Sequence, residues 1–250
     1  MFYVEENKRV EWVNRIKYLK DKYPFKLRYP SNDKLNTPLV ISSINKYLMK
    51  CGKKYHISTG VGNHQMMTYQ FVEGRFPKRI HSSGSLGVMG AGLPYAVGIQ
   101  IANPESLVID IDGDSSFMMT MSDLKTIKEY NLPIKIAIMN DSRQMMVNIW
   151  ERLFFEERYT ATINKSNPNF CSLAESFGIK SFKCSNSKEI DNTVHYFLEH
   201  NGPALCDFRV EPEICLPLVG PGKALDDMIM FDDYHKDNCD INLDKSFVPS

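Results

Sequence analysis

Short apolar runs alternate with amphipathic stretches along most of this 250-residue chain. Apolar runs bounded by turn-forming residues are typical of buried strands, and apolar residues recurring every three to four positions are typical of helices. The pattern predicts strands at 55–58, 80–82, 107–111, 134–139, 181–184 and 204–209. It predicts helices at 65–71, 89–102, 121–130, 145–157, 170–177 and 188–199. This alternation predicts an α/β fold with a doubly wound, mostly parallel sheet and helices on both faces.

Regions of different character flank the alternating core. Residues 5–22 combine many charges with apolar positions at helical spacing, which predicts an amphipathic helix, and a proline-containing linker follows. Asn36-Thr37-Pro38 then begins a helix that runs to about Lys50 and stops at Gly52. From Leu216 the chain contains proline and glycine and then becomes acidic, which suggests a tail. We therefore expect three regions: an N-terminal helix and linker at 1–35, the main domain at 36–215 and a C-terminal tail at 216–250.

Composition excludes several classes of function. Thirty basic and thirty acidic residues cancel, and no basic stripe stands out, so we expect no nucleic-acid partner. The longest apolar runs are too short to span a bilayer, so we expect no membrane partner. The first residues resemble neither a signal peptide nor a transit peptide, and six scattered cysteines without a Cys-x-x-Cys pair suggest reduced thiols. The chain is expected to be cytoplasmic.

Oxygen-rich turns follow two of the predicted strands. Gly113-Asp114-Ser115 follows the strand at 107–111, and Asn140-Asp141 follows the strand at 134–139. One crossover between parallel strands would bring both turns to the carboxyl edge of the sheet, where open α/β folds bind ligands. Carboxylates there suit Mg²⁺, which usually takes one or two of them and completes its shell with phosphate oxygens. The alternative is that Asp114 only caps the next helix. The second turn favours a metal-held diphosphate, with the backbone N–H groups of Ser115 and Ser116 facing it.

These turns resemble the thiamine diphosphate signature, which opens Gly-Asp-Gly and closes Asn-Asn. Further motifs resemble the large, catalytic subunit of acetolactate synthase, in the order and spacing of that family from about residue 10 to residue 230. They are Gly-Val-Gly-Asn-His-Gln-Met at 60–66, the glycine-rich segment at 83–94, Met-Val-Asn-Ile-Trp at 146–150, and residues 153–159 and 216–219. The resemblance covers nearly the whole chain but only the C-terminal third of the family's much longer subunit. It implies the diphosphate-binding domain of the thiamine diphosphate fold.

The resemblance also implies a set of diphosphate and metal contacts. Asp114, Asp141 and the backbone carbonyl of Arg143 would hold Mg²⁺, and Gly113 to Ser116 would border the diphosphate. Asp141 stands where the family has Asn, which keeps an oxygen ligand but adds a charge beside the diphosphate. Asn63 and His64 match a Gln-His pair near the diphosphate, and Asn63 is one methylene shorter than the family's Gln. An isolated His at a strand end is otherwise a surface or capping group.

The same resemblance assigns residues to the cofactor rings and the acceptor pocket. The backbone of Gly87 would bind the aminopyrimidine, and Met89 would wedge behind the rings and bend the cofactor. Without the resemblance, these would be a helix-packing glycine and a core methionine. Met146 and Trp150 lie four residues apart, hence on one helix face, and would line the acceptor pocket. Met146 would also touch the cofactor; the alternative for this pair is a core stripe. Met89, Met146 and Trp150 are the catalytic candidates.

The family's chemistry also needs a glutamate beside the pyrimidine, carried by a separate N-terminal domain of another subunit, and neither that domain nor the flavin-binding middle domain is present here. Glu151, Glu156 and Glu157 are instead predicted on the outer face of the Trp150 helix. We therefore expect a thiamine diphosphate- and Mg²⁺-binding half of an acetolactate synthase-like enzyme of branched-chain amino acid biosynthesis. It would decarboxylate pyruvate, transfer the two-carbon unit to a second 2-oxo acid, and act as a homo- or hetero-oligomer with a pyrimidine-binding domain. FAD would belong only to the full family enzyme. The alternative is a non-catalytic remnant or regulator that binds the cofactor or a partner without turnover.

Overall fold

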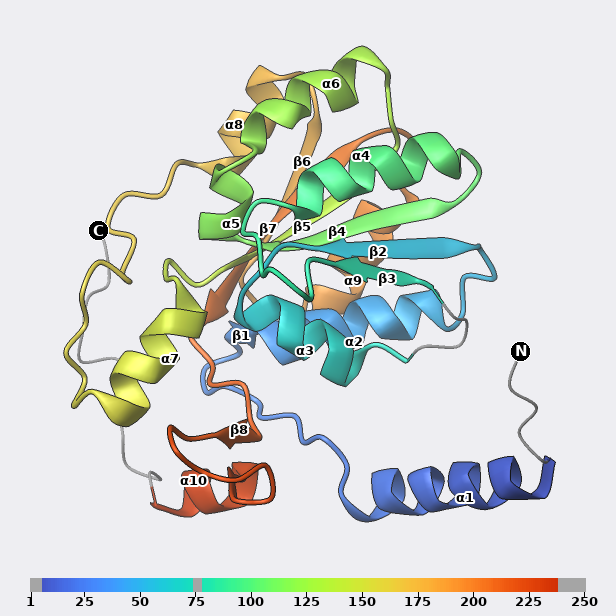
Figure 1. Cartoon of the computed structure of the whole chain (residues 1–250). Coiled ribbons are helices and arrows are strands. Elements are labelled where there is room, and N and C mark those ends of the chain that lie inside the picture. Colours follow the sequence, from blue (N-terminus) through green and yellow to red (C-terminus); the bar gives the residue numbers. More distant parts are fainter. Residues whose placement is uncertain (1–5, 74–77, 238–250) are drawn as a thin grey trace.

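A parallel sheet forms the centre of the computed structural model, which describes residues 6–73 and 78–237 (Figure 1). In the described part of the chain this sheet has seven strands in the order β1-β7-β5-β4-β2-β3, with β6 also paired to β7. Every pair within it is parallel. The strands are β1 (Leu35–Asn36), β2 (Tyr55–Thr59), β3 (Ile80–Ser82), β4 (Leu107–Gly113), β5 (Lys135–Asn140), β6 (Lys180–Cys184) and β7 (Ala204–Glu211). The predicted fold class is confirmed.

Helices cover both faces of the sheet, as Figure 1 shows. Below it in that view lie α2 (Thr37–Leu48), α3 (Asn63–Phe71) and α9 (Ile190–Glu199). Above it lie α4 (Gly92–Ala102), α5 (Asp114–Met118), α6 (Leu124–Glu129) and α8 (Phe170–Ser176), with the 3-10 turn η1 (Met121–Asp123) before α6. Successive strand residues point to opposite faces. Ile109 and Ile111 of β4 therefore join one buried apolar cluster, and Val108 joins the other.

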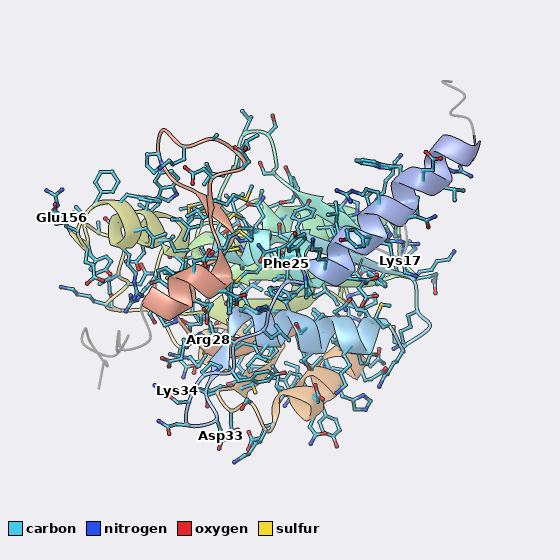
Figure 2. All side chains as sticks on the ribbon, turned by 90° about the horizontal axis from the view of Figure 1, so that it is seen from below. Lys17, Phe25, Arg28, Asp33, Lys34 and Glu156 are labelled. Carbon is cyan, nitrogen blue, oxygen red and sulfur yellow. The ribbon has the colours of Figure 1, made fainter. Side chains whose placement is uncertain are left out.

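The two ends of the described chain lie outside this layered core. Helix α1 (Glu6–Lys22) projects from one side in Figure 2, where Lys17 is labelled. On the other side, α7 (Met145–Phe154) packs through Met145 and Ile149 against Ile214 and Leu216. The segment predicted to be a tail contains the antiparallel pair β8 (Leu218–Val219) and β9 (Met228–Ile229), followed by α10 (Phe231–Asp237). No helix within the described ranges is long and apolar enough to cross a membrane.

Two buried carboxylates shape the junction between β2, β4 and α4. Asp110 and Asp112 of β4 are fully buried, and Ser58 donates a 3.0 Å hydrogen bond to Asp110. Burial, and then the charge of Asp112, raises the pKa of Asp110 well above its usual range. Room for these groups comes from Gly60 after β2 and Gly92 at the start of α4. A Cβ on Gly92 would lie 2.5 Å from the Gly60 backbone nitrogen and 2.6 Å from Asp110 Oδ1.

Two predicted helices are shorter in the structure because residues near their ends have positive φ. The helix predicted from Met89 begins only at Gly92, because Gly90 adopts a φ of +79° that no α-helix accommodates. Met89 therefore lies on a loop. The helix predicted to reach Glu157 ends at Phe154, and Glu156 and Glu157 both have positive φ. Figure 2 labels Glu156 at this turn, on the side opposite α1.

Candidate functional site

A cleft opens at the carboxyl edge of the sheet, where β2 and β4 lie side by side and their connections leave in opposite directions. From β2 the chain passes through α3 to the edge strand β3, whereas from β4 it passes through α5 and α6 to β5 on the other side. Such a switch point is where open α/β sheets bind ligands. Counted together with the open solvent at its mouth, the cleft holds about 470 Å³ free of protein atoms. Its lining is Thr37, Val61, Gly62, Asn63, His64, Met89, Gly113, Asp114, Ser115, Ser116, Met139, Asp141, Arg143, Gln144, Met145, Met146 and Val147.

Asp114, at the start of α5, presents its two carboxylate oxygens to different surroundings. The residue is 1% exposed, and burial raises its pKa above the usual value. Oδ2 accepts hydrogen bonds from the side-chain amides of Asn164, at 2.9 Å, and Asn167. Oδ1 is buried and has no hydrogen-bond partner among the described residues. A buried carboxylate oxygen without a donor is costly, and a cation would satisfy it.

Asp141 reaches the same cleft from the end of β5. Its Oδ1 accepts a 3.0 Å bond from the backbone N–H of Arg143. Burial raises the pKa of Asp141 well above its usual range, and the negative charge of Asp114 raises it further. The two carboxylates therefore repel each other across the cleft, and a divalent cation between them would remove that repulsion.

The backbone of Arg143 is placed by a neighbouring segment of the 157–169 loop. Gln144 N–H donates to the Thr162 carbonyl at 2.9 Å, and Asn164 N–H donates to the Ser142 carbonyl at 2.8 Å. These bonds flank an antiparallel bridge between Arg143 and Ile163, so that pair is of the non-hydrogen-bonded kind. The N–H and C=O of Arg143 consequently face away from residue 163. The N–H donates to Asp141, and the carbonyl faces the same side as this N–H.

His64 and Asn63 begin α3 on the opposite wall of the cleft. The His64 ring packs against the backbone of Gly113, where a Cβ would lie 2.8 Å from Nδ1. Its Nε2 lies 3.3 Å from Asp112 Oδ1. The Asn63 amide nitrogen donates a 2.6 Å bond to the Glu213 carbonyl, which occupies one of its two N–H groups. Asn63 Oδ1 is buried without a partner among the described residues.

The glycine-rich loop before α4 borders the cleft through Met89. Gly90 N–H donates to Ser116 Oγ at 2.9 Å and Thr120 Oγ1 donates to the Gly90 carbonyl at 2.8 Å, which docks the loop on α5. Gly87 has a φ of +63° and lies outside the cleft lining. The neighbouring Leu86 is 87% exposed, an unusual position for a leucine.

Helix α7 supplies the wall of the cleft that follows residues 141–144. Met146 and Val147 line the cleft, whereas Trp150 packs against Phe154 with ring centroids 5.1 Å apart and lies outside the lining. The prediction that Glu151 faces solvent is wrong. Glu151 is buried and accepts bonds from Thr160 N–H, at 2.8 Å, and from the Thr162 hydroxyl, at 2.5 Å. These two bonds tie the 157–169 loop to α7 through the inward-facing Glu151.

The structure thus brings most of the sequence-predicted residues to one cleft. Those that line it are Asn63, His64, Met89, Gly113, Asp114, Ser115, Ser116, Asp141, Arg143 and Met146. Sequence reasoning missed Asn164 and Asn167, which bind Asp114; Asn167 also donates at 3.3 Å to Asn140, a residue of the predicted Asn140-Asp141 turn. The only signal was a polar Asn-x-x-Asn segment without periodicity.

The donor set fits a metal-held diphosphate. Two carboxylates, one with an unpartnered oxygen, and one backbone carbonyl supply hard oxygen ligands of the kind Mg²⁺ takes in proteins. Phosphate oxygens and water would complete the ligand set of such a cation. Gly62 and Gly113 leave room for the His64 ring, because a Cβ at either position would lie within 3 Å of a ring atom.

Comparisons with known proteins agree with this chemistry. Residues 60–208 match the family model described as "Thiamine pyrophosphate enzyme, C-terminal TPP binding domain". The chain is 40% identical over 226 residues to the mitochondrial acetolactate synthase catalytic subunit of Saccharomyces cerevisiae, covering 90% of this chain and 33% of that protein. It is 39% identical over 224 residues to the mitochondrial acetolactate synthase of Schizosaccharomyces pombe, covering 89% and 33%.

A bacterial relative shows the same partial coverage. The large subunit of acetolactate synthase isozyme 2 of Escherichia coli is 34% identical over 220 residues, which cover 88% of this chain and 39% of that protein. The chain therefore spans about a third of the length of these relatives.

Proposed function

The chain belongs to the thiamine pyrophosphate enzymes through their C-terminal TPP-binding domain, and from this premise we propose that it forms the diphosphate-binding half of an acetolactate synthase-like active site. The observation that carries the proposal is the unpartnered Oδ1 of Asp114, a residue that lines the cleft together with a second carboxylate, Asp141. Its predicted substrate is a 2-oxo acid such as pyruvate, with a second 2-oxo acid as acceptor.

The residues of this chain would hold the cofactor and exclude water from it. Asp114, Asp141 and the Arg143 carbonyl would bind Mg²⁺, and the cation would bind the diphosphate. His64, Ser115 and Ser116 border the space that the diphosphate would occupy. Thiamine diphosphate, when bound, supplies the electron sink for decarboxylating a 2-oxo acid and transferring its two-carbon unit.

Apolar side chains would shape the space beyond the diphosphate. Met89 and Met146 line the cleft from the glycine-rich loop and α7, respectively. We infer that Met89 supports the cofactor rings and that Met146 contacts both cofactor and substrate. Gly87 and Trp150 lie outside the lining in this chain taken alone, and their roles at the aminopyrimidine and in the acceptor pocket remain part of the proposal.

The active site is proposed to need a second component. The buried carboxylate of Asp114 and the partly buried one of Asp141 belong to the proposed metal site, and Asp112 lies near His64. The acid that activates the pyrimidine would come from a pyrimidine-binding domain, on a partner subunit in a homo- or hetero-oligomer. The flavin of the whole family enzyme is assigned to no residue of this chain.

Reconstitution tests the catalytic proposal. The purified chain is assayed for acetolactate with pyruvate, Mg²⁺ and thiamine diphosphate, alone and with the N-terminal two thirds of the Saccharomyces relative. We expect no product from the chain alone and measurable product from the mixture. Robust turnover by the chain alone would contradict the half-site. A mixture that binds the cofactor but forms no product would favour the non-catalytic alternative.

The predicted cytoplasmic location is a separate proposal. Two of the relatives described above are named as mitochondrial proteins. Fluorescent tagging at the C-terminus in the source cell tests it, and a mitochondrial or plastid signal would contradict it.

A further inference from the structure

We propose that Asn164 and Asn167 are positioning residues that make Asp114 a one-oxygen metal ligand and thereby select Mg²⁺ over Ca²⁺. The inference rests on the proposed function, because it requires that Asp114 holds the cation of a diphosphate cofactor. It concerns the loop between α7 and α8, which carries none of the proposed ligands.

The hydrogen bonds of Asp114 are divided unequally between its two oxygens. Oδ2 accepts from both asparagine amides, with a distance of 2.9 Å to Asn164 Nδ2. Oδ1 has no donor among the described residues and is buried at the cleft. Two donors on one oxygen fix the rotation of the carboxylate and leave only the other oxygen for a cation.

Asn167 is itself held at the end of a central strand. The Asn167 amide also donates to Asn140 Oδ1 at 3.3 Å, and Asn140 donates to the buried Asp207 of β7 at 2.9 Å. Asn167 therefore links the start of α5 to the end of β5, and Asn140 continues the link to the middle of β7.

Asn164 is held at two further points. Its backbone N–H donates to the Ser142 carbonyl at 2.8 Å, and its side chain donates to Ser115 Oγ at 2.6 Å. The side chain thus bridges Ser115 and Asp114, while the backbone fixes the turn after Asp141. Both amides are therefore held by further hydrogen bonds, from Asn167 to Asn140 and from Asn164 to Ser115 and Ser142. These bonds fix the positions from which the amides donate to Asp114 Oδ2.

The selectivity follows from how the two cations use carboxylates. Ca²⁺ takes six to eight oxygen ligands and often binds a carboxylate through both oxygens, whereas Mg²⁺ demands a near-octahedral shell with shorter bonds. With Oδ2 occupied by two N–H donors, Asp114 can offer a single oxygen, which suits Mg²⁺. Without the asparagines, Oδ2 would be free and Asp114 could bind Ca²⁺ through both oxygens.

The test measures the affinity for thiamine diphosphate by calorimetry, once in Mg²⁺ and once in Ca²⁺. The proteins are the full chain, Asn164→Ala, Asn167→Ala and the double variant. Loss of groups that orient a metal ligand typically lowers metal affinity about 10- to 100-fold. We expect that loss for Mg²⁺ in the double variant and a smaller loss for Ca²⁺, so that the Mg²⁺/Ca²⁺ affinity ratio falls about tenfold. Each single variant keeps one donor on Oδ2 and should give an intermediate ratio.

Asn169→Ala is the matched control. Asn169 lies in the same segment, but its side chain caps α8 by accepting a 3.2 Å bond from Ser172 N–H and does not bind Asp114. This control variant should be less stable but should keep the Mg²⁺/Ca²⁺ affinity ratio of the unaltered chain. Equal losses for both cations, an unchanged ratio, or the same shift in Asn169→Ala would overturn the selectivity proposal while the proposed function stands. If the unaltered chain binds thiamine diphosphate equally with and without either metal, the proposed function fails and this inference fails with it. The single variants, which retain one donor, keep the test decisive if the double variant does not fold.

Discussion

Replacing Gly92 by alanine should destabilise the domain strongly, because three polar groups crowd this position. The new Cβ would lie 2.5 Å from the Gly60 backbone nitrogen, 2.6 Å from Asp110 Oδ1 and 2.9 Å from Asp112 Oδ2. The nearest atom belongs to backbone, which cannot rotate away. The two carboxylates are fully buried, so they have little room to move.

The expected change in the free energy of unfolding is best judged against a second glycine of the same helix. Overpacking a well-filled interior costs roughly 1–3 kcal/mol, and the backbone clash places Gly92→Ala in the upper part of that range. Gly98→Ala, in the same helix α4, meets nothing within 4 Å and lies on an exposed surface. There alanine should stabilise the helix by roughly 0.5–1 kcal/mol. The two variants make the same chemical change, and their predicted effects have opposite signs.

Urea unfolding followed by circular dichroism measures both free energies of unfolding. For a domain of this size about 1 kcal/mol corresponds to roughly 2–4 °C in Tm, so a thermal scan should separate the variants by several degrees. Gly92→Ala should also weaken cofactor binding. The clash pushes on the backbone of Gly60, and the chain after Gly60 forms the wall of the cleft that carries His64. An effect of Gly92→Ala within about 0.5 kcal/mol of zero would refute the claim that β2, β4 and α4 meet without space for one methyl group.

Three further predictions concern the metal, the pocket and pH. Asp114→Ala should abolish Mg²⁺-dependent binding of thiamine diphosphate in calorimetry, whereas Asp141→Asn should bind the cofactor at least as well as the unaltered chain. Unchanged binding by Asp114→Ala would contradict the metal assignment. Trp150→Leu should leave binding intact but change the acceptor ratio of pyruvate to 2-oxobutyrate about tenfold in the reconstituted enzyme, since one methylene in an apolar pocket is worth roughly 1–3 kcal/mol; an unchanged ratio would indicate a packing role. Burial, and then the charge of the Arg79 guanidinium, lowers the pKa values of His56 and His81. As the pH falls through about 6.5, the unfolded chain therefore binds protons at these histidines before the folded chain does. Stability should therefore be full above that pH and decline below it, and a double His→Gln variant should show a shallower decline in urea midpoint between pH 7.5 and 5.5; identical slopes would exclude these histidines as the cause.

The central sheet could be predicted because its strands carry their own signal. Leu107 to Ile111 and Ile134 to Met139 are apolar runs that end in polar turns, and β4 and β5 occupy these positions as parallel neighbours. Since parallel neighbours end at the same edge, the convergence of Asp114 and Asp141 on one cleft followed from the sequence pattern. The two-residue strands β1, β8 and β9 were missed because such short elements have no periodicity of their own.

The rest of the site depends on contacts that the sequence pattern does not encode. Asn164 and Asn167 come from a loop about 50 residues beyond Asp114 and meet it only after the sheet has formed. Glu151 was predicted to be exposed, yet the loop that folds back over α7 buries it. Trp150 lies on the predicted helix, but its contact with Phe154 and its position outside the cleft lining depend on how α7 is rotated against the core.

The most direct test of the central claim is a calorimetric titration of the purified chain with thiamine diphosphate, with and without Mg²⁺. The account predicts saturable binding of one cofactor per chain that requires Mg²⁺ and disappears when the metal is chelated, because Asp114 and Asp141 repel the diphosphate unless a cation lies between them. Saturable binding of the same affinity in the absence of any divalent metal would contradict the account.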